Sequence, residues 1–341
     1  MLKIPPKIKL GINGFGRIGR LITRIVIGMP NIELVAINNP STTPEYMAYL
    51  FKYDSVHGKF NGKIEYNDNQ LIINNKHIDI YRELKPFDIK WSDSNADYII
   101  ESTGRFTTLD QASLHLNGGS KKVIVTSPSQ DIPMFVMGVN ENKYSSNINI
   151  VSNASCTTNC LAPLVKVIDD NFCIVEGFVT TIHAITASQK TVDSSSVKDW
   201  RAGRSTINNI IPSSTGASKV ITKIYPHLNE KIKCMSFRVP IIDVSTIDCT
   251  IKIKKEVSLE EVINIIKNYS DNELIGILGY TRDDVVSSDF IGDSRSCIVD
   301  IKSSMILGNN FIKLVAWYDN EWGYSNRVVN LLEYMYKVDN L

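Results

Sequence analysis

The chain has 341 residues, of which 43 % are hydrophobic and 21 % are charged. This length allows two domains, each with its own core, and the composition is ordinary for a globular protein. The formal net charge is +1, so no strongly basic surface indicates nucleic acid as the main partner.

The sequence carries no sign of membrane insertion or export. No apolar run approaches the ~20 residues of a membrane-spanning helix, and residues 1–6 lack the apolar core of a secretory signal. The same short N-terminus argues against an organelle transit peptide. Six scattered cysteines fit a reducing compartment better than a disulfide framework. We therefore expect a cytoplasmic protein with no membrane partner.

The first motif in chain order is rich in glycine. The run G-F-G-R-I-G at 14–19 lies between the apolar stretches 7–13 and 21–26, which predicts a strand, a tight turn and a helix. Glycines let the backbone approach a pyrophosphate, and the N-terminus of the helix supplies N–H donors for the anion. A second apolar stretch, 33–38, ends where a residue that contacts a ribose belongs. The pattern predicts a dinucleotide site, although glycines also serve ordinary turns.

Up to about residue 150, apolar β-type runs alternate with helical or polar stretches. The runs 96–100 and 122–126 are examples, and E-S-T-G at 101–104 follows the first of them. Alternation of this kind predicts a mostly parallel sheet with helices on both faces. Polar residues directly after such runs fall on the carboxyl edge of the sheet, where a doubly wound fold binds its ligand.

A candidate nucleophile follows at Cys156, within S-N-A-S-C-T-T-N-C at 152–160. A helix is expected over about 157–171, and its free N–H groups and partial positive charge would stabilise a thiolate. The alternative is a cysteine that acts as a small buried hydrophobe. Cys160, four residues later, would lie on the same helix face; we expect it to be buried, since that spacing is too wide for an unstrained disulfide.

A candidate base, His183, lies in an apolar, β-branched run at 180–186. Cysteine nucleophiles need an imidazole that is near in space but not necessarily in sequence. Alone, this histidine would more often be a hydrogen-bonded structural residue of a strand. Together with Cys156 it predicts a nucleophile and base pair beside a dinucleotide site, as in an aldehyde dehydrogenase that works through a thioester.

The remaining chain predicts a second domain. The longer β-type runs 176–187, 235–239 and 245–255 indicate a more antiparallel sheet, and the polar stretch 188–209 reads as a long ordered loop. Apolar residues at helical spacing over 325–338 predict a helix that packs back on the first domain.

The predicted fold is therefore α/β. A Rossmann-type domain with a doubly wound parallel sheet spans 1–155 and is completed by a C-terminal helix at about 321–341. An α+β catalytic domain with a largely antiparallel sheet spans 156–320.

The chain resembles the phosphorylating glyceraldehyde-3-phosphate dehydrogenase family along nearly its whole length. The motifs that carry this resemblance are I-N-G-F-G-R-I-G-R at 12–20, K-Y-D-S-V-H-G-K-F at 52–60, E-S-T-G at 101–104, S-N-A-S-C-T-T-N-C at 152–160, I-I-P-S-S-T-G-A at 210–217, F-R-V-P at 237–240 and W-Y-D-N-E-W-G-Y-S-N-R-V at 317–328. The resemblance implies a homotetramer that oxidises glyceraldehyde 3-phosphate with inorganic phosphate.

By the same resemblance, Cys156 adds to the aldehyde and His183 takes the proton while hydride leaves for the nicotinamide. Phosphate then releases the thioester as an acyl phosphate. The residues matched to the substrate phosphate are Thr186 and Arg238, with Arg201 near both anions. Those matched to the attacking phosphate are Ser155, Thr157, Thr215 and Gly216. Without the motifs, Arg238 would read as an edge residue in a surface salt bridge and the hydroxyl residues as turn formers.

The resemblance also implies the residues that bind the dinucleotide, and no metal. The positions matched to the cofactor site are Gly14, Gly16, Arg17, Ile18, Gly19, Asn39, Thr103, Gly104, Thr126, Ser195, Asn320 and Tyr324. Asn320 would orient the nicotinamide amide and Tyr324 would pack beside the ring. The family's basic residue near the adenine does not align cleanly with the segment 82–85.

Two positions depart from the members that use NAD. Those members have Asn-Asp-Pro after the second strand, and the carboxylate binds the ribose and repels a 2′-phosphate; here the sequence is Asn38-Asn39-Pro40. In the loop, a Gly-Pro or Leu-Pro pair of the NAD enzymes aligns with Ser194-Ser195. The hypothesis is that NADP is accepted, with Asn39 and Ser195 beside the 2′-phosphate. The alternative is that Asn39 still binds the ribose of NAD.

The sequence leaves three other functions open. One is a dehydrogenase of another phosphorylated aldehyde, such as erythrose 4-phosphate. A second is a semialdehyde dehydrogenase, which the two phosphate sites disfavour. The third is a non-catalytic protein that binds RNA or another protein.

Overall fold

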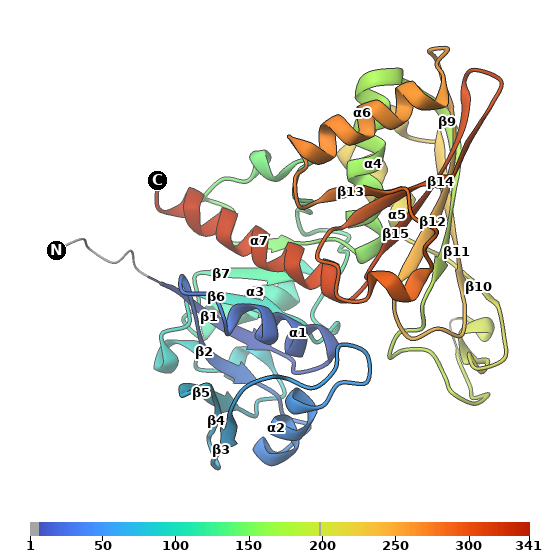
Figure 1. Cartoon of the computed structure of the whole chain (residues 1–341). Coiled ribbons are helices and arrows are strands. Elements are labelled where there is room, and N and C mark those ends of the chain that lie inside the picture. The colour runs from blue at the N-terminus through green and yellow to red at the C-terminus, as the bar shows by residue number, and fades with distance from the viewer. Residues whose placement is uncertain (1–6, 198) are drawn as a thin grey trace. The chain divides into compact units, whose positions relative to one another are not determined.

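The computed structural model describes residues 7–197 and 199–341 (Figure 1). Residues 1–6, on which the targeting prediction rests, and residue 198 of the predicted loop lie outside the described residues. The chain divides into two compact units. The first comprises Met1–Phe135, Glu141–Ala154 and Ser325–Leu341, and the second Val136–Asn140 and Ser155–Tyr324. Residues 136–140, which the sequence prediction placed in the first domain, group with the second unit.

The first unit contains a sheet of eight strands in the order β3-β4-β5-β2-β1-β6-β7-β8. From β5 to β8 all neighbours are parallel, whereas β3, β4 and β5 form an antiparallel extension that the sequence prediction missed. The strands are β1 (Ile8–Asn13), β2 (Ile32–Asn38), β3 (Ile64–Tyr66), β4 (Gln70–Ile73), β5 (Lys76–Tyr81), β6 (Tyr98–Glu101), β7 (Lys122–Val125) and β8 (Ile150–Ser152).

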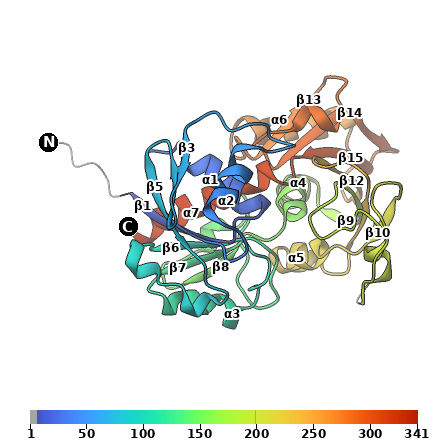
Figure 2. The ribbon, with the colours of Figure 1, turned by 90° about the horizontal axis from the view of Figure 1, so that it is seen from below.

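Helices cover both faces of this sheet. Figure 2 shows α1 (Arg17–Val26) and α2 (Pro44–Lys52) on one side and α3 (Leu109–Asn117) on the other. The central strands are therefore largely apolar: Leu10 and Ile12 of β1 and Ile100 of β6 have no exposed surface. A sheet buried on both faces requires such runs, which confirms the predicted Rossmann-type architecture.

The C-terminal helix α7 (Trp322–Asp339) contributes most of its length to the first unit. Val328, Leu331, Leu332 and Met335 recur at helical spacing and are fully buried, which confirms the predicted helix over 325–338. Its end is held by the carboxylate of Asp339, which accepts hydrogen bonds from the hydroxyls of Tyr98 at 2.6 Å and Tyr144 at 2.8 Å.

The second unit contains a sheet of seven strands in the order β10-β11-β9-β12-β15-β14-β13. Most neighbours are antiparallel, as predicted, while β11 with β9 and β13 with β14 are parallel. The strands are β9 (Ile174–His183), β10 (Ile211–Ser213), β11 (Ile232–Arg238), β12 (Ser245–Ile253), β13 (Leu278–Thr281), β14 (Cys297–Leu307) and β15 (Phe311–Tyr318).

One face of the second sheet is packed by α4 (Cys156–Phe172), α5 (Ala217–Ile224) and α6 (Leu259–Asp271), which gather on the same side in Figure 1. The central helix α4 is buried along most of its length. Cys160 is one of its fully buried residues, which confirms the interpretation of that cysteine as part of the core. No helix among the described residues is long and apolar enough to cross a membrane.

Among its described residues, the polar stretch predicted as a loop contains a short 3-10 helix, Trp200–Gly203, and an isolated bridge between Lys190 and Ser205. Asp193 orders it, since its carboxylate accepts hydrogen bonds from Arg204 Nε at 3.0 Å and from the backbone N–H of Ser205 at 2.9 Å. The loop is thus built around its own polar contacts.

Candidate active site

The glycine turn between β1 and α1 closes tightly. Gly14 has a φ of +97°, and a Cβ at Gly19 would lie 2.1 Å from the carbonyl oxygen of Gly14. Gly16 caps α1 without any side-chain hydrogen bond, and a Cβ there would meet nothing within 4 Å. The space beside Gly16 at the start of α1 is therefore open, as it must be where a pyrophosphate approaches a helix N-terminus. The residues fit a dinucleotide.

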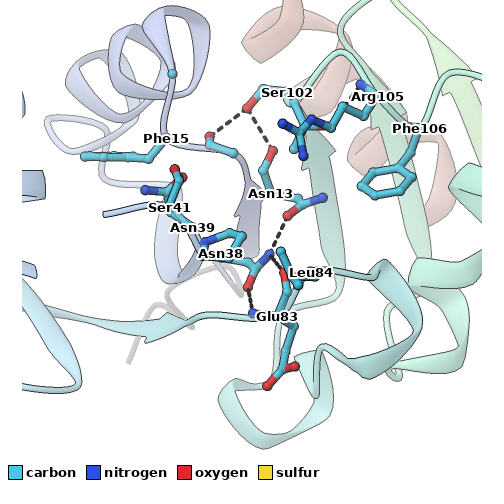
Figure 3. Close-up of a pocket in the computed structure, with 14 residues that line it drawn as sticks. Asn13, Phe15, Asn38, Asn39, Ser41, Glu83, Leu84, Ser102, Arg105 and Phe106 are labelled. Atoms are coloured by element: carbon cyan, nitrogen blue, oxygen red, sulfur yellow. Dashed lines mark hydrogen bonds between the residues drawn. The ribbon is translucent and has the colours of Figure 1, made fainter. Parts of the chain in front are cut away.

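A pocket opens beside this turn at the carboxyl edge of the first sheet (Figure 3). Its lining residues are Asn13, Gly14, Phe15, Gly16, Asn38, Asn39, Pro40, Ser41, Glu83, Leu84, Ser102, Thr103, Arg105 and Phe106. Four predicted cofactor residues are among them: Gly14, Gly16, Asn39 and Thr103. Arg17, Ile18 and Gly19 lie on α1, while Gly104 and Thr126 follow β6 and β7.

The segment 82–85, where the family's basic adenine residue was sought, brings Glu83 and Leu84 to the pocket. Arg82 instead donates a hydrogen bond to the carbonyl of Asp68 at 2.8 Å. Among the described residues that line the pocket, Arg105 carries the one positive charge. Sequence reasoning missed Arg105, although its place directly after E-S-T-G could have indicated it.

A buried carboxylate fixes the floor of the pocket. Glu101 is 1 % exposed and accepts hydrogen bonds from Asn13 Nδ2 at 2.5 Å, from the backbone N–H of Thr103 at 2.8 Å and from the hydroxyl of Thr103. Its fourth partner is the fully buried His115, whose Nε2 lies 2.9 Å away. Trp91 Nε1 donates to His115 Nδ1 at 3.1 Å, so the proton of the ring sits on Nε2 and points to Glu101. Because every partner donates, the carboxylate is satisfied although it is buried.

The hydrogen-bond network at the base of the pocket continues through the side-chain amides of Asn13 and Asn38. Asn38 Nδ2 donates to Asn13 Oδ1 at 2.7 Å, and Asn38 Oδ1 accepts from the backbone N–H of Glu83 at 2.8 Å. These bonds, drawn in Figure 3, fix the orientation of both amides. Sequence reasoning did not find this network, because its members come from strands and helices far apart in the chain.

Arg17 is held by a second buried carboxylate, that of Asp54 in the K-Y-D-S-V-H-G-K-F motif. The guanidinium Nη1 lies 2.6 Å from Asp54 Oδ2, and the Asp54 side chain is 2 % exposed. Asp54 also accepts hydrogen bonds from the backbone N–H groups of Val56 and His57, each at 2.9 Å. Burial raises the pKa of Asp54, but the N–H groups of His57 and Val56 and the Arg17 guanidinium outweigh it and lower the pKa to about 2.

We predict that Asp54→Asn lowers the free energy of unfolding at pH 7 by about 2 kcal/mol. The pKa of the folded state, about 2, lies below the ordinary value of 3.8. The stabilisation is therefore complete above about pH 4 and is lost as the pH falls through about 2. Urea unfolding of both proteins between pH 7 and pH 3 measures it. A deficit in the variant that does not shrink at the acid end would contradict this assignment.

In the second unit, Cys156 and His183 lie together. Cys156 is the first residue of α4, capped by Ser155, whose hydroxyl accepts from the N–H of Thr158 at 3.1 Å. His183 is the last residue of β9 and is 4 % exposed. Their Sγ and Nε2 atoms are 3.5 Å apart, within contact distance for proton transfer. The structure thus brings the predicted nucleophile and base side by side at the start of a helix.

The electrostatics of the pair differ in part from the prediction. Burial raises the pKa of the Cys156 thiol, while the Arg238 charge and the first N–H groups of α4 lower it without reversing the shift. Burial and Arg238 together lower the pKa of His183 to about 3. The imidazole is therefore neutral, and burial opposes the stabilisation of a thiolate that the sequence predicted from the start of the helix.

Neighbouring side chains hold His183 and the side-chain amide of Asn320 in place. The buried Tyr318 hydroxyl lies 2.9 Å from Thr181 Oγ1 and 3.0 Å from Thr157 Oγ1, and its ring stands edge-on to His183. The Ser245 hydroxyl donates to Asn320 Oδ1 at 2.7 Å and accepts from the N–H of Ala184 at 3.0 Å.

Family models match both halves of the chain. Residues 8–109 match the model described as "Glyceraldehyde 3-phosphate dehydrogenase, NAD binding domain". Residues 155–320 match the model described as "Glyceraldehyde 3-phosphate dehydrogenase, C-terminal domain".

Similar proteins cover nearly the whole chain. The cytosolic glyceraldehyde-3-phosphate dehydrogenase of Sinapis alba is 56 % identical over 333 residues, which are 97 % of this chain and 98 % of the relative. Glyceraldehyde-3-phosphate dehydrogenase 2 of Mucor circinelloides f. lusitanicus is 56 % identical over 331 residues, with the same coverage. The cytosolic enzyme GAPC2 of Arabidopsis thaliana is 55 % identical over 334 residues, again with 97 % and 98 % coverage.

The chain belongs to the glyceraldehyde-3-phosphate dehydrogenase family. This confirms the resemblance drawn from the motifs. All residues that line the pocket of Figure 3 lie in the region matched to the family's NAD-binding domain. Cys156, His183 and Arg238 lie in the region matched to its C-terminal domain.

The residues predicted to bind anions are partly engaged with other groups of the chain. Thr157 presents its hydroxyl to Tyr318, and the exposed Thr186 donates to Gln189 Oε1 at 2.7 Å. Thr215 accepts from the N–H of Ala217 at 3.2 Å, next to Gly216, which caps α5. Arg238 lies against His183, with Nη1 2.6 Å from Nδ1. Arg238 is therefore in contact with His183, the predicted base.

Three further residues of the predicted sites are not among the contacts described above. Arg201 and Ser195 are exposed in the loop between β9 and β10. Tyr324 is 5 % exposed near the start of α7. Their predicted roles at the anion and cofactor sites remain predictions.

Proposed function

We propose that the protein is a phosphorylating glyceraldehyde-3-phosphate dehydrogenase of the cytoplasm that acts in glycolysis and gluconeogenesis. It oxidises D-glyceraldehyde 3-phosphate with inorganic phosphate and NAD(P) to 1,3-bisphosphoglycerate, as a homotetramer. The observation that carries the proposal is the pair of Cys156 Sγ and His183 Nε2, 3.5 Å apart at the start of α4. The sequence identity to enzymes of that name supports it further.

The chemistry follows from the pair. Cys156 sulfur bonds to the aldehyde carbon and gives a hemithioacetal. His183 Nε2 accepts the proton of its hydroxyl as the thioester forms. A nicotinamide dinucleotide, when bound, takes up the hydride from that carbon. Inorganic phosphate then attacks the thioester carbon, the carbon–sulfur bond breaks, and the acyl phosphate leaves. Arg238 and Thr186 are proposed to hold the substrate phosphate, and Ser155, Thr157, Thr215 and Gly216 the attacking one.

A steady-state assay with glyceraldehyde 3-phosphate, phosphate and each dinucleotide tests the proposal. Continued formation of reduced dinucleotide, beyond one equivalent per active site, should require phosphate or arsenate to release the acyl enzyme. Faster turnover of erythrose 4-phosphate than of glyceraldehyde 3-phosphate would favour the dehydrogenase of that sugar phosphate. No turnover of either aldehyde would favour a non-catalytic binding protein.

We further propose that NADP is accepted, with Asn39 beside the 2′-phosphate. Asn39 is 8 % exposed and uncharged, and its side chain is paired with the hydroxyls of Thr42 and Ser41. No carboxylate at this position repels a phosphate, and the positive charge of Arg105 on the same pocket suits one. The carboxylate of Glu83 points away from Asn39 in Figure 3. Ser195 is proposed as a second residue near the 2′-phosphate.

Asn39→Asp tests this proposal. A carboxylate at 39 should lower kcat/KM for NADP by about 10- to 100-fold, or roughly 1.4–2.8 kcal/mol, and leave kcat/KM for NAD equal or higher. Asn61→Asp, at an exposed position on the same unit, is the control. A strong preference for NAD that Asn39→Asp leaves unchanged would remove the NADP proposal without touching the dehydrogenase activity.

A further inference from the structure

The carboxylate of Glu101 joins two parts of the pocket in Figure 3. Its Oε1 accepts from the backbone N–H and the hydroxyl of Thr103, and Thr103 Oγ1 in turn accepts from the backbone N–H of Arg105 at 3.1 Å. Its Oε2 accepts from Asn13 Nδ2 at 2.5 Å, and Asn13 Oδ1 accepts from Asn38, as drawn in Figure 3. One buried carboxylate therefore fixes pocket residues that follow β6 together with pocket residues that end β1 and β2.

Of the described residues that donate to this carboxylate, His115 is the one outside the pocket lining. It lies on α3, has no exposed surface, and its Nε2 is 2.9 Å from Glu101 Oε2, the oxygen that Asn13 also contacts. Because Trp91 Nε1 donates to His115 Nδ1 at 3.1 Å, the ring presents Nε2–H to Glu101. Trp91 and Glu101 thus hold the imidazole by its two nitrogens.

We propose that His115 is a positioning residue for the adenosine half of the dinucleotide. Its N–H group holds the Glu101 carboxylate in the place from which that carboxylate fixes Asn13 and Thr103. The pocket lies beside the glycine turn and the end of β2, where a doubly wound domain binds the adenosine ribose. The inference rests on the proposed function, because it requires a nicotinamide dinucleotide to bind in this pocket.

The loss of this donor would act on the pocket. A buried carboxylate that loses a donor is left partly unsatisfied, and its surroundings relax until other donors replace the lost one. The other described donors to the Glu101 carboxylate are Asn13 and Thr103, and both line the pocket. A shift of Thr103 also moves Arg105, the positively charged residue of the lining, because Thr103 Oγ1 holds its N–H group. We therefore expect the response to a change at His115 within the pocket.

Three substitutions of His115 separate its N–H group from the rest of the side chain. His115→Met fills a similar volume and has no donor. In His115→Asn the amide oxygen can still accept from Trp91, but the amide N–H groups stop short of Glu101, because the shorter side chain ends near the position of Nδ1. His115→Gln is one methylene longer and brings an N–H group to the position of Nε2.

Tyr81→Phe is the matched control for stability. The Tyr81 ring stands edge-on to Trp91, with 5.9 Å between the ring centroids, and its hydroxyl lies 2.7 Å from Ser94 Oγ. The substitution therefore removes a hydrogen bond beside the same core and leaves every bond to Glu101 in place. Calorimetric titration with NAD, and with ADP-ribose, which lacks the nicotinamide, gives two Kd values for each variant. The Tm of each variant is measured alongside.

His115→Met and His115→Asn should raise the Kd of NAD and the Kd of ADP-ribose by the same factor, about tenfold, which is the size of one hydrogen bond to a charged group. The kcat at saturating NAD and the KM for glyceraldehyde 3-phosphate should stay as in the wild type, because Cys156 and His183 belong to the second unit. His115→Gln should restore both Kd values. Tyr81→Phe should lower the Tm and leave both Kd values unchanged.

Several outcomes overturn the inference. If His115→Met and His115→Asn lower the Tm and leave both Kd values unchanged, His115 serves only the fold. The same conclusion follows if neither variant folds while His115→Gln does. A Kd that rises for NAD but not for ADP-ribose places the effect at the nicotinamide end, and a His115→Gln variant that binds as weakly as His115→Asn shows that the N–H group does not matter. A wild-type protein that binds neither NAD nor ADP-ribose defeats the proposed function first.

Discussion

Cys156→Ser is expected to lower kcat/KM for glyceraldehyde 3-phosphate by about 10⁴-fold or more, the order found when a covalent nucleophile is removed. A serine hydroxyl at the start of α4 is a far weaker nucleophile than a thiol, because it holds its proton far more tightly. Release of reduced dinucleotide, followed by absorbance, measures the loss. A single-turnover experiment should show no burst.

His183→Asn should cost less, about 10²- to 10⁴-fold, because the nucleophile remains and only proton transfer is lost. Cys173→Ser is the matched control: Cys173 is an exposed cysteine at the end of α4, remote in sequence from the pair. It should keep wild-type activity and an unchanged Tm. A Cys156→Ser variant that turns over at the wild-type rate would end the thioester mechanism.

The sequence predicted those parts of the site that arise within one short segment. The turn at 14–19 and the cap before Cys156 are local arrangements, and the glycines and small polar residues that form them are visible as patterns. The helix begins at Cys156, one residue before its predicted start. The alternation of apolar runs with helical stretches likewise predicted the first sheet, because strands covered on two faces need continuous apolar sequence.

The contacts that orient the site join distant segments and were not predicted. Glu101 meets Asn13 across two neighbouring strands and His115 from the following helix. Tyr318 reaches Thr157 and Thr181 over more than a hundred residues of chain. Each of these side chains is ordinary in its local sequence, and only the strand order brings it to its partner.

The balance that sets the ionisation of Cys156 has the same origin. The helix start at Cys156 was visible in the sequence, but the burial of its sulfur and the approach of Arg238 come from β9 and β11, which pair in parallel with His183 directly opposite Arg238. A local argument could supply only the charge of the helix dipole. The balance of burial and charge required the packed unit.

Gly16→Ala and Gly19→Ala should separate binding of the dinucleotide from stability of the turn. A Cβ at Gly16 meets nothing within 4 Å in the protein and its φ of −73° suits alanine, so the Tm should not change. The methyl group would occupy the space that a pyrophosphate needs above α1, and affinity should fall about 100-fold, or roughly 2.8 kcal/mol. Calorimetric titration with the dinucleotide measures the affinity.

The second variant serves as the contrast. In Gly19→Ala the Cβ would lie 2.1 Å from the carbonyl oxygen of Gly14 and 3.0 Å from Ser102 Oγ, so the turn must open. Overpacking of this kind costs about 1–3 kcal/mol, and both the Tm and the affinity should fall. Equal losses of Tm in the two variants would mean that Gly16 serves the turn and not the ligand. An unchanged affinity in Gly16→Ala would place the pyrophosphate away from the start of α1, since that methyl group has no other neighbour to disturb.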